Sequence, residues 1–258
     1  RRAVRSWTRH SSIAPRVEVP GASEAEQRQL AVLGGLAFAL AKGETTQWPE
    51  DVARWAAEAP PPPDGLLDLI LRGFDAGIDS LAEAYNASIS ATNRRRLGTV
   101  FTPDDVVEYM LDLADAHLSE PPAVVIDPGA GVGAFTLSAA RRWPTARIIA
   151  VDINPVTLGL LGARLARERL TDAGLREAAI ELVLDDYLDA LPALLKRPRT
   201  VPALVLGNPP YTRTQALSPE YKERASGLTD GMITSGHANL AMLFQALTLA
   251  QLRPGDAS

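Results

Sequence analysis

The tetrapeptide Asn208-Pro209-Pro210-Tyr211 follows a short apolar run and could do chemistry on an amino group. Two consecutive prolines lack backbone N–H groups and fix an extended path. The side-chain oxygen of Asn208 and the carbonyl of Pro209 can then point the same way, as two rigid acceptors. Such a pair could hold both N–H groups of an aromatic amine and stabilise the positive charge that develops when its nitrogen attacks. The Tyr211 ring could stack on an extruded base. A Pro-Pro turn with a surface tyrosine is the structural alternative.

A glycine-rich segment, Asp127-Pro-Gly-Ala-Gly-Val-Gly-Ala-Phe135, lies between a predicted strand and a predicted helix. Glycine has no Cβ, so the backbone there can turn tightly and approach a ligand closely. The spacing Gly129-x-Gly131-x-x-Ala134 also satisfies the relaxed dinucleotide fingerprint. A nicotinamide enzyme and a purely structural turn therefore both stay open at this point.

Acidic residues follow the next two predicted strands. Asp152, 25 residues after Asp127, closes the second strand and could accept hydrogen bonds from the ribose hydroxyls of a nucleoside cofactor. Asp186 could accept from an adenine amino group, and the adjacent Tyr187 ring could cover the base. The alternatives are a helix N-terminal acid for Asp152 and ordinary loop residues for the Asp-Tyr pair.

These residues need a frame of alternating strands and helices to bring them together. Short apolar runs predict four strands, at residues 123–126, 147–151, 180–184 and 203–206. The runs are β-branched and do not alternate with polar residues, which is typical of strands covered on both faces. Helices are expected between them, one ending near residue 143 and one over about 155–170. This order predicts an α/β fold with a parallel, doubly wound sheet and right-handed crossovers.

The preceding part of the chain has helical periodicity. Three helices are expected, beginning at the capping box Ser23–Glu26, at Pro49 and at about Leu66. Gly43 is placed to stop the first, Pro60–Pro63 separates the second from the third, and the third should run into the 80s. Nothing in these helices indicates chemistry, so we expect them to pack or to dock a partner. The predicted domains are a helical N-terminal region, 1–95, and a second domain, 96–258.

Composition sets further limits. The 258 residues are 46% hydrophobic and 22% charged, which is ordinary for a soluble globular protein. The longest apolar run, 30–41, is interrupted by two glycines and is shorter than the ~18 residues that a membrane span needs. The absence of cysteine excludes disulfides, thiolate metal sites and cysteine nucleophiles. A cytoplasmic protein without a membrane partner is the simplest expectation.

The charge distribution tells more than the net charge. A net charge of −5 argues against non-specific gripping of nucleic acid. However, residues 1–16 carry five arginines and no acid, and residues 191–225 carry six basic and two acidic side chains. The second stretch surrounds the tetrapeptide, which favours phosphate contact there over a merely solvated surface.

Two of these motifs together resemble a known family. The glycine-rich segment with Asn208-Pro209-Pro210-Tyr211 resembles the amino-group methyltransferases that act on exocyclic nitrogens of DNA bases. Upstream, Gly98-Thr99-Val100-Phe101-Thr102-Pro103, followed by an amphipathic helix, looks like their F-x-T-P segment. The order of the three blocks is similar to that of the gamma-type N6-adenine DNA methyltransferases of restriction-modification and phage-defence systems. The resemblance covers about Arg95 to Gly255.

The resemblance implies a Rossmann-like methyltransferase sheet, preceded by the helical region, with S-adenosyl-L-methionine as cofactor and no metal. The implied cofactor residues are Thr102 and Asp127 at the methionine end, Gly129, Gly131 and Phe135 around the pocket, Asp152 at the ribose, Ile153 on the adenine ring, and Asp186 with Tyr187 at the adenine amino group. A second implied set, which would bind an adenine flipped out of double-stranded DNA, is Asn208, Pro209, Pro210 and Tyr211. Transfer would be a direct in-line displacement that depends on positioning. The lack of cysteine fits, because methylation at cytosine C5 needs a thiolate.

Two expectations concern the rest of the protein. Family members continue beyond the helix that ends near Leu252 with more strands and a recognition domain. We therefore expect a sheet incomplete at its C-terminal side, a native product that runs beyond Ser258, and a true N-terminus before Arg1. Other subunits of a restriction or defence complex are further expected partners.

Three rival functions remain. Release factor glutamine methyltransferases also combine Asn-Pro-Pro-Tyr with a helical N-terminal domain, but they lack the segment seen at Thr102-Pro103. RNA adenine methylation is a further alternative. A non-catalytic cofactor-binding subunit of a defence assembly is the last, and the intact tetrapeptide argues against it.

Overall fold

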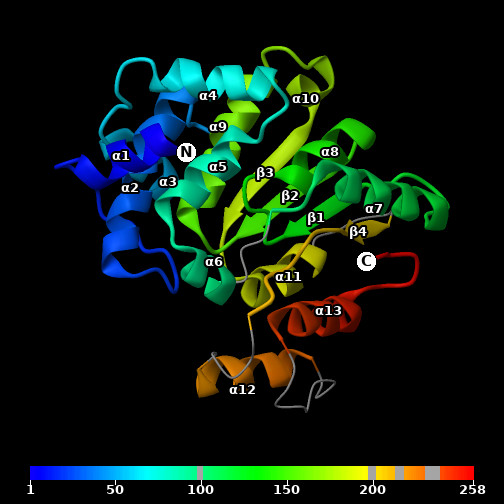
Figure 1. The fold of residues 1–258 in the computed structure, drawn as a ribbon. Coiled ribbons are helices and arrows are strands. Elements are labelled where there is room, and N and C mark those ends of the chain that lie inside the picture. Colours follow the sequence, from blue (N-terminus) through cyan, green and yellow to red (C-terminus); the bar gives the residue numbers. More distant parts are fainter. Residues whose placement is uncertain (98–100, 197–201, 213–217, 230–238) are drawn as a thin grey trace.

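The computed structural model describes residues 1–258 except 98–100, 197–201, 213–217 and 230–238. Its centre is a parallel sheet with the strand order β3-β2-β1-β4 (Figure 1). The strands are β1 Val124–Pro128, β2 Arg147–Asp152, β3 Ala179–Leu184 and β4 Ala203–Val205. The predicted α/β architecture is confirmed, and the expected strand positions agree with these bounds to within two residues.

Alternate residues of the two central strands enter two separate hydrophobic clusters. Val125 and Ile148 belong to the cluster on one face, and Ile126 and Ile149 belong to the cluster on the other. Both faces of β1 and β2 are therefore covered, as the continuous apolar runs predicted. The edge strand β3 differs, because most of its side chains are only partly buried.

Helices cover both faces of the sheet. The helices of the N-terminal region are α1 Arg2–His10, α2 Glu24–Leu40, α3 Glu50–Glu58, α4 Leu66–Asp75, α5 Ser80–Ser88 and α6 Ala91–Leu97. Helices α1 to α5 share one hydrophobic cluster with α7 Asp104–His117, α8 Ala134–Arg142 and α9 Pro155–Glu168. The short α10, Ala173–Glu177, precedes β3. The other face carries α11 Tyr187–Lys196, α12 Pro219–Leu228 and α13 Leu240–Gln251.

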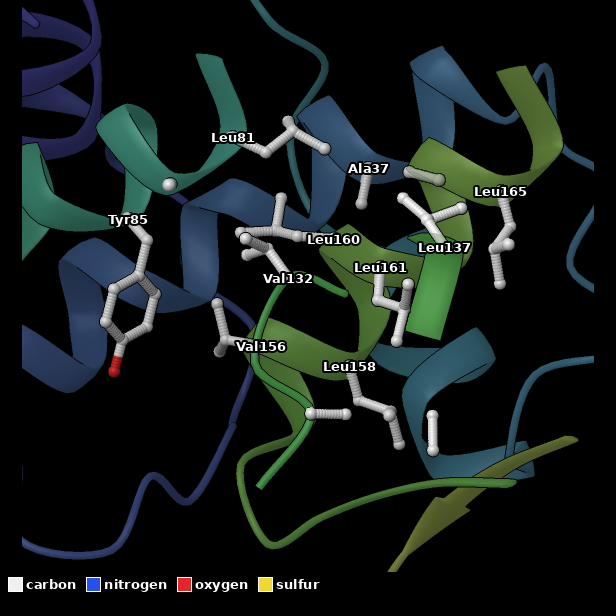
Figure 2. Close-up of a cluster of buried hydrophobic side chains, with 14 of the residues drawn as sticks. Ala37, Leu81, Tyr85, Val132, Leu137, Val156, Leu158, Leu160, Leu161 and Leu165 are labelled. Atoms are coloured by element: carbon white, nitrogen blue, oxygen red, sulfur yellow. The ribbon is translucent and has the colours of Figure 1, made fainter. Parts of the chain in front are cut away.

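The N-terminal helices pack on α9 through close aromatic contacts. Gly159 lies under the Trp55 indole, where an added Cβ would come within 2.7 Å of its ring. Gly162 lies in the same way under Trp48, at 2.5 Å. The Trp55 indole N–H donates to the Ala31 carbonyl at 3.0 Å, so its burial leaves no orphaned donor. Figure 2 shows the leucines of α9 buried among side chains of the earlier helices.

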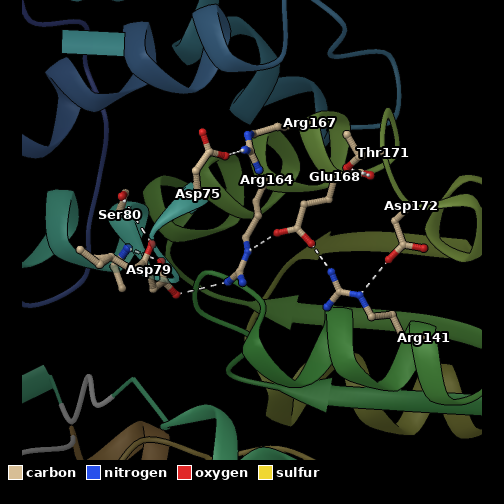
Figure 3. Close-up of polar contacts among 11 residues, drawn as sticks. Asp75, Asp79, Ser80, Arg141, Arg164, Arg167, Glu168, Thr171 and Asp172 are labelled. Atoms are coloured by element: carbon tan, nitrogen blue, oxygen red, sulfur yellow. Dashed lines mark hydrogen bonds and ion pairs between the residues drawn. The ribbon is translucent and has the colours of Figure 1, made fainter. Parts of the chain in front are cut away.

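A chain of ion pairs links the same elements (Figure 3). Asp79 pairs with Arg164 of α9 at 3.2 Å, and Arg164 pairs with Glu168 at 2.8 Å. Glu168 in turn contacts Arg141 of α8, which pairs with Asp172, the N-cap of α10, at 2.9 Å. Arg164 and Glu168 are largely buried, so these pairs are less screened than surface pairs.

The third predicted helix is wrong as a single element. The structure ends α4 at Asp75 and begins α5 at Ser80. Gly77 has φ +73°, and the Ile78 N–H donates back to the Gly73 carbonyl at 2.9 Å, which closes the first helix. The Asp79 carboxylate then caps the second by accepting from the Ala82 N–H at 2.9 Å. Ile78, which lies in the break between the two helices, is 47% exposed.

The other end signals act as predicted. Ser23 and Glu26 form the reciprocal capping box of α2. The helix ends at Leu40, and the Gly43 N–H closes the turn onto the Phe38 carbonyl at 3.1 Å with φ +79°. None of the described helices is long and apolar enough to cross a membrane.

The free edge of β4 meets the last residues of the chain. The Val205 N–H donates to the Ala257 carbonyl at 2.9 Å, and the Ala257 N–H donates to the Ala203 carbonyl at 3.0 Å. Asp256 also accepts from the Ala203 N–H at 2.9 Å. The sheet was expected to be incomplete on this side, but at Leu204 the edge of β4 forms a parallel bridge with Ala257.

Candidate active site

A cavity of about 410 Å³ lies where the strands end. Its walls come from the glycine-rich turn after β1, the ends of β2 and β3, the segment after β4, and residues of the N-terminal region. The carboxyl edge of a parallel sheet is where ligands of such folds bind. The volume is within the range of small-molecule sites.

The glycine turn wraps one side of the cavity. The N–H groups of Gly129 and Ala130 donate to the Val151 carbonyl at 2.8 and 3.0 Å, which fixes the turn against β2. Gly129 and Gly131 have φ of +73° and +58°, a region that favours glycine. A Cβ on Gly131 would lie 3.6 Å from the Phe101 ring, inside the cradle. The turn therefore keeps its backbone accessible to a ligand.

Asp152 is held at the rim by the backbone. Its two carboxylate oxygens accept from the N–H groups of Gly131 and Asn154 at 2.7 and 2.8 Å. Burial raises the pKa of Asp152, and these two N–H groups oppose that rise. The Thr157 hydroxyl and the Ile153 N–H oppose the rise as well, so four donors of the chain face this carboxylate. The neighbouring Ile153 is 49% exposed at the cavity.

Asp127 lies behind the turn. Its side chain is 1% exposed, does not line the cavity, and accepts from the Thr136 hydroxyl at 2.6 Å. Burial raises the pKa of Asp127 to about 7. An added Cβ at Gly207 would come within 2.7 Å of the Asp127 carboxylate, so the small residue before the tetrapeptide makes room for it.

Asp186 and Tyr187, which follow β3, lie in different surroundings. Tyr187 is 3% exposed; its ring lies 4.5 Å from that of Phe244, and its hydroxyl hydrogen-bonds Thr248 at 2.7 Å. Asp186 is less buried and contacts Tyr221 and Arg224 of α12. Both members of the pair border the cavity.

The tetrapeptide forms the cavity wall next to the glycine turn. The Asn208 amide nitrogen donates to the Thr102 hydroxyl at 3.0 Å, which turns the amide so that its oxygen is the remaining acceptor. Pro210 packs on the glycine turn, with its Cδ 3.5 Å from the position of a Cβ on Gly129. Tyr211 is 53% exposed beside this wall.

Most of the residues singled out from the sequence meet at this one cavity. Those that line it are Thr102, Gly129, Gly131, Phe135, Asp152, Ile153, Asp186, Tyr187, Asn208 and Pro210. Asp127 lies behind it, and Pro209 and Tyr211 adjoin it in the chain. Gly98, Thr99 and Val100 of the predicted Thr-Pro segment lie outside the described residues.

Sequence reasoning missed several wall residues. The segment Val19–Gly21 and Asp79 reach the cavity from the N-terminal region, and Tyr221 and Phe244 reach it from the far side. The Pro20-Gly21 pair was a turn signal, but nothing local says which cavity that turn would face. The N-terminal region therefore contributes to the site as well as to packing.

Comparison with known proteins places this geometry in context. A type II methyltransferase of Xanthomonas campestris pv. amaranthicola, M.XamI, is 32% identical over 195 residues, which are 74% of this chain and 34% of that protein. A release factor glutamine methyltransferase of Cereibacter sphaeroides is 33% identical over 113 residues, 43% of this chain and 36% of that protein. The chain thus spans about a third of the length of these relatives. A putative class I S-adenosylmethionine-dependent methyltransferase structure from Listeria monocytogenes has a TM-score of 0.49 at 14% identity, over 98% of this chain and 70% of that one.

The family assignment rests on a longer match. The sequence model described as N-6 DNA Methylase matches residues 76–255, which is more than half of the chain and includes every site residue predicted from the sequence. The predicted Rossmann-like methyltransferase sheet behind a helical region is confirmed, and S-adenosyl-L-methionine is the cofactor. The cavity fits it, with a glycine cradle that a Cβ would fill and a backbone-held carboxylate at the rim. The chain belongs to the N-6 DNA Methylase family.

Proposed function

We propose that this chain transfers a methyl group from S-adenosyl-L-methionine to the N6 amino group of adenine in DNA. The observation that carries the proposal is the Asn208–Thr102 hydrogen bond of 3.0 Å at the cavity wall. Because the amide nitrogen is engaged there, the amide oxygen is left to accept from an amino group. The Pro209 carbonyl, which follows it in a segment with no N–H at either proline, is the second acceptor.

Different residues around the cavity would bind different parts of the cofactor. Asp152 would take the ribose hydroxyls, since it lines the cavity at the end of β2. Ile153, half-exposed beside it, would pack on the adenine ring. Thr102 would hold the methionine end from the cavity wall, and Asp127 would help to hold that end from behind the glycine turn. Asp186 would accept from the adenine amino group.

The bound cofactor supplies a methyl group on a positively charged sulfur. Asn208 and Pro209 hold the target nitrogen in line with that group by accepting its two N–H groups. Their hydrogen bonds strengthen as the nitrogen becomes positive, so they stabilise the transition state more than the ground state. Tyr211, half-exposed next to the tetrapeptide, offers a ring face for the target base.

The wider setting follows from the same proposal. An adenine inside a duplex cannot reach this cavity, so the target base of double-stranded DNA would be flipped out of the stack. The chain would act in a restriction-modification or phage-defence system, in the cytoplasm and with other subunits as partners; its similarity to the type II methyltransferase M.XamI supports a methyltransferase role. The basic stretch 191–225 would contact the DNA backbone.

Glutamine methylation is the second candidate, because the release factor enzyme of Cereibacter sphaeroides is 33% identical over its shorter match. A primary amide nitrogen could occupy the same two acceptors. The match to the family of DNA methylases over residues 76–255 favours adenine.

Transfer of tritiated methyl groups tests the proposal. The protein is incubated with labelled cofactor and, in parallel, with adenine-containing DNA, RNA or a release factor. The proposal expects label in DNA, recovered as N6-methyladenine after digestion, and no label with the Asn208→Ala variant. Label in the release factor or in RNA alone would overturn it.

A further inference from the structure

Helix α12 brings two side chains onto Asp186. The Tyr221 hydroxyl donates to Asp186 Oδ1 at 3.3 Å, and the Arg224 guanidinium contacts Oδ2 at 3.2 Å. Arg224 also pairs with Asp189 of α11 at 3.0 Å and lies over the Tyr221 ring, 5.1 Å from its centroid. Tyr221 itself lines the cavity beside Asp186. This helix lies between the tetrapeptide and α13 in the chain (Figure 1).

The placement of these side chains follows from how α12 is built. Ser218 caps its first turn by accepting from the Tyr221 N–H at 3.2 Å, and Pro219 occupies the first helical position. Ala225 is fully buried in the cluster that includes α11 and α13, which seats the helix on that face. Tyr221 and Arg224, three residues apart, therefore emerge on one side of the helix.

The hydrogen bonds of Asp186 leave one acceptor position. Oδ1 accepts from the Leu188 N–H at 2.9 Å and from Tyr221. Oδ2 accepts from Arg224. A carboxylate offers about four lone-pair positions, so among the residues that the structure describes these three bonds leave one, on Oδ2. Burial and Asp186 raise the pKa of Tyr221, which keeps its hydroxyl a donor.

We propose that Tyr221 and Arg224 are positioning residues of the cofactor site. They fix the Asp186 carboxylate so that its one remaining acceptor position selects a nucleoside whose base carries an exocyclic amino group. This rests on the proposed function, because it takes S-adenosyl-L-methionine as the ligand of the cavity. Recognition of the cofactor's adenine would then depend on α12, the helix that follows the tetrapeptide. One stretch of chain would therefore contribute to both the target-base subsite and the cofactor subsite.

The charges around Asp186 make its dependence on Arg224 specific. Arg224 and Tyr221 face it from α12, Asp189 faces it from α11, and Asp185 precedes it in the chain. Burial raises the pKa of Asp186 and Asp189 adds to this, whereas the Leu188 N–H, Arg224 and Tyr221 oppose it. Without the guanidinium, the pKa of Asp186 would rise further and the carboxylate would lose one of the contacts that orient it.

Calorimetric titration with two ligands tests the inference. The ligands are S-adenosyl-L-homocysteine and S-inosyl-L-homocysteine, which carries an oxygen in place of the amino group. For the Arg224→Gln variant we expect adenosyl affinity to fall about tenfold, the effect of losing one hydrogen bond to a charged group, and the ratio of adenosyl to inosyl affinity to fall with it. Tyr221→Phe should lower the same ratio by about threefold, a smaller effect because this contact is longer and Asp186 keeps its pairing with Arg224. Lys222→Gln, the matched loss of charge on the same helix, should change neither affinity.

The outcomes separate the two proposals. If the unaltered protein does not bind S-adenosyl-L-homocysteine, the proposed function fails. If it binds and Arg224→Gln keeps the full preference for the adenosyl ligand, only the present inference is overturned. Should Arg224→Gln fail to fold by circular dichroism, Tyr221→Phe, which retains the ring, decides by the same ratio. A weaker adenosyl affinity at low pH in Arg224→Gln, with an unchanged profile in Lys222→Gln, would support it.

Discussion

The buried carboxyl of Asp127 makes the stability of this protein depend on pH near neutrality. A folded-state pKa of about 7, against an ordinary value of 3.8, means that the folded chain binds a proton that the unfolded chain has already released. The stabilising contribution of the protonated form is complete below about pH 4 and is lost as the pH rises through about 7. The cost of the ionised form reaches about 4 kcal/mol, at 1.36 kcal/mol for each tenfold change in the equilibrium.

Asp127→Asn removes this titration while keeping the shape of the side chain. Urea denaturation at about pH 5 and about pH 8 gives the free energy of unfolding of both proteins. Between these two pH values, we expect the free energy of unfolding of the unaltered protein to fall by about 3 kcal/mol relative to that of the variant. The reason is that about two pH units of the interval between the ordinary and the folded-state pKa lie above pH 5. All other titrating groups are common to both chains, so their slopes cancel. An equal difference in unfolding free energy at both pH values would refute the reasoning.

Three further changes test the site and the core. Asp152→Ala should weaken cofactor binding by about 1.5–3 kcal/mol, the worth of hydrogen bonds to a charged group, measured by calorimetry; an unchanged Kd would remove Asp152 from the ribose subsite. Asn208→Ala should lower turnover at least about 100-fold with nearly unchanged cofactor affinity, because its oxygen acts on the transition state; near-normal turnover would mean that the tetrapeptide is structural. Trp48→Ala should destabilise the fold by about 3 kcal/mol, since the indole fills the space above Gly162. A thermal midpoint equal to that of the unaltered protein would contradict this.

The sheet could be predicted from the sequence because its signals are local. The β-branched runs, the turn at Gly129 and the cap at Ser23 each specify backbone conformation within a few residues. The order of strands and helices then leaves few topologies. The carboxyl edge follows from that topology, which is why Asp152 and Asn208 could be expected near one another.

The rest depended on tertiary contacts that no local pattern contains. The break between α4 and α5 is the exception, because Gly77 and Asp79 are local signals, and the apolar spacing that continues through them concealed it. The approach of Val19–Gly21 to the cavity depends on how α2 packs against α9. The engagement of Asp186 by Arg224 joins residues 38 apart in the chain. Such pairings are decided by packing, and one sequence does not display them.

The tryptophan–glycine contacts on α9 bear on how this protein could be recombined with its relatives. A chimera that took residues 1–60 from another family member would bring foreign side chains against the grooves at Gly159 and Gly162. In the reverse chimera, which keeps residues 1–60 of this chain, any residue larger than glycine at either position would collide with the Trp55 or Trp48 indole. The unit that can be exchanged is therefore discontinuous in sequence. The first 60 residues must be exchanged together with α9, which follows β2 much later in the chain.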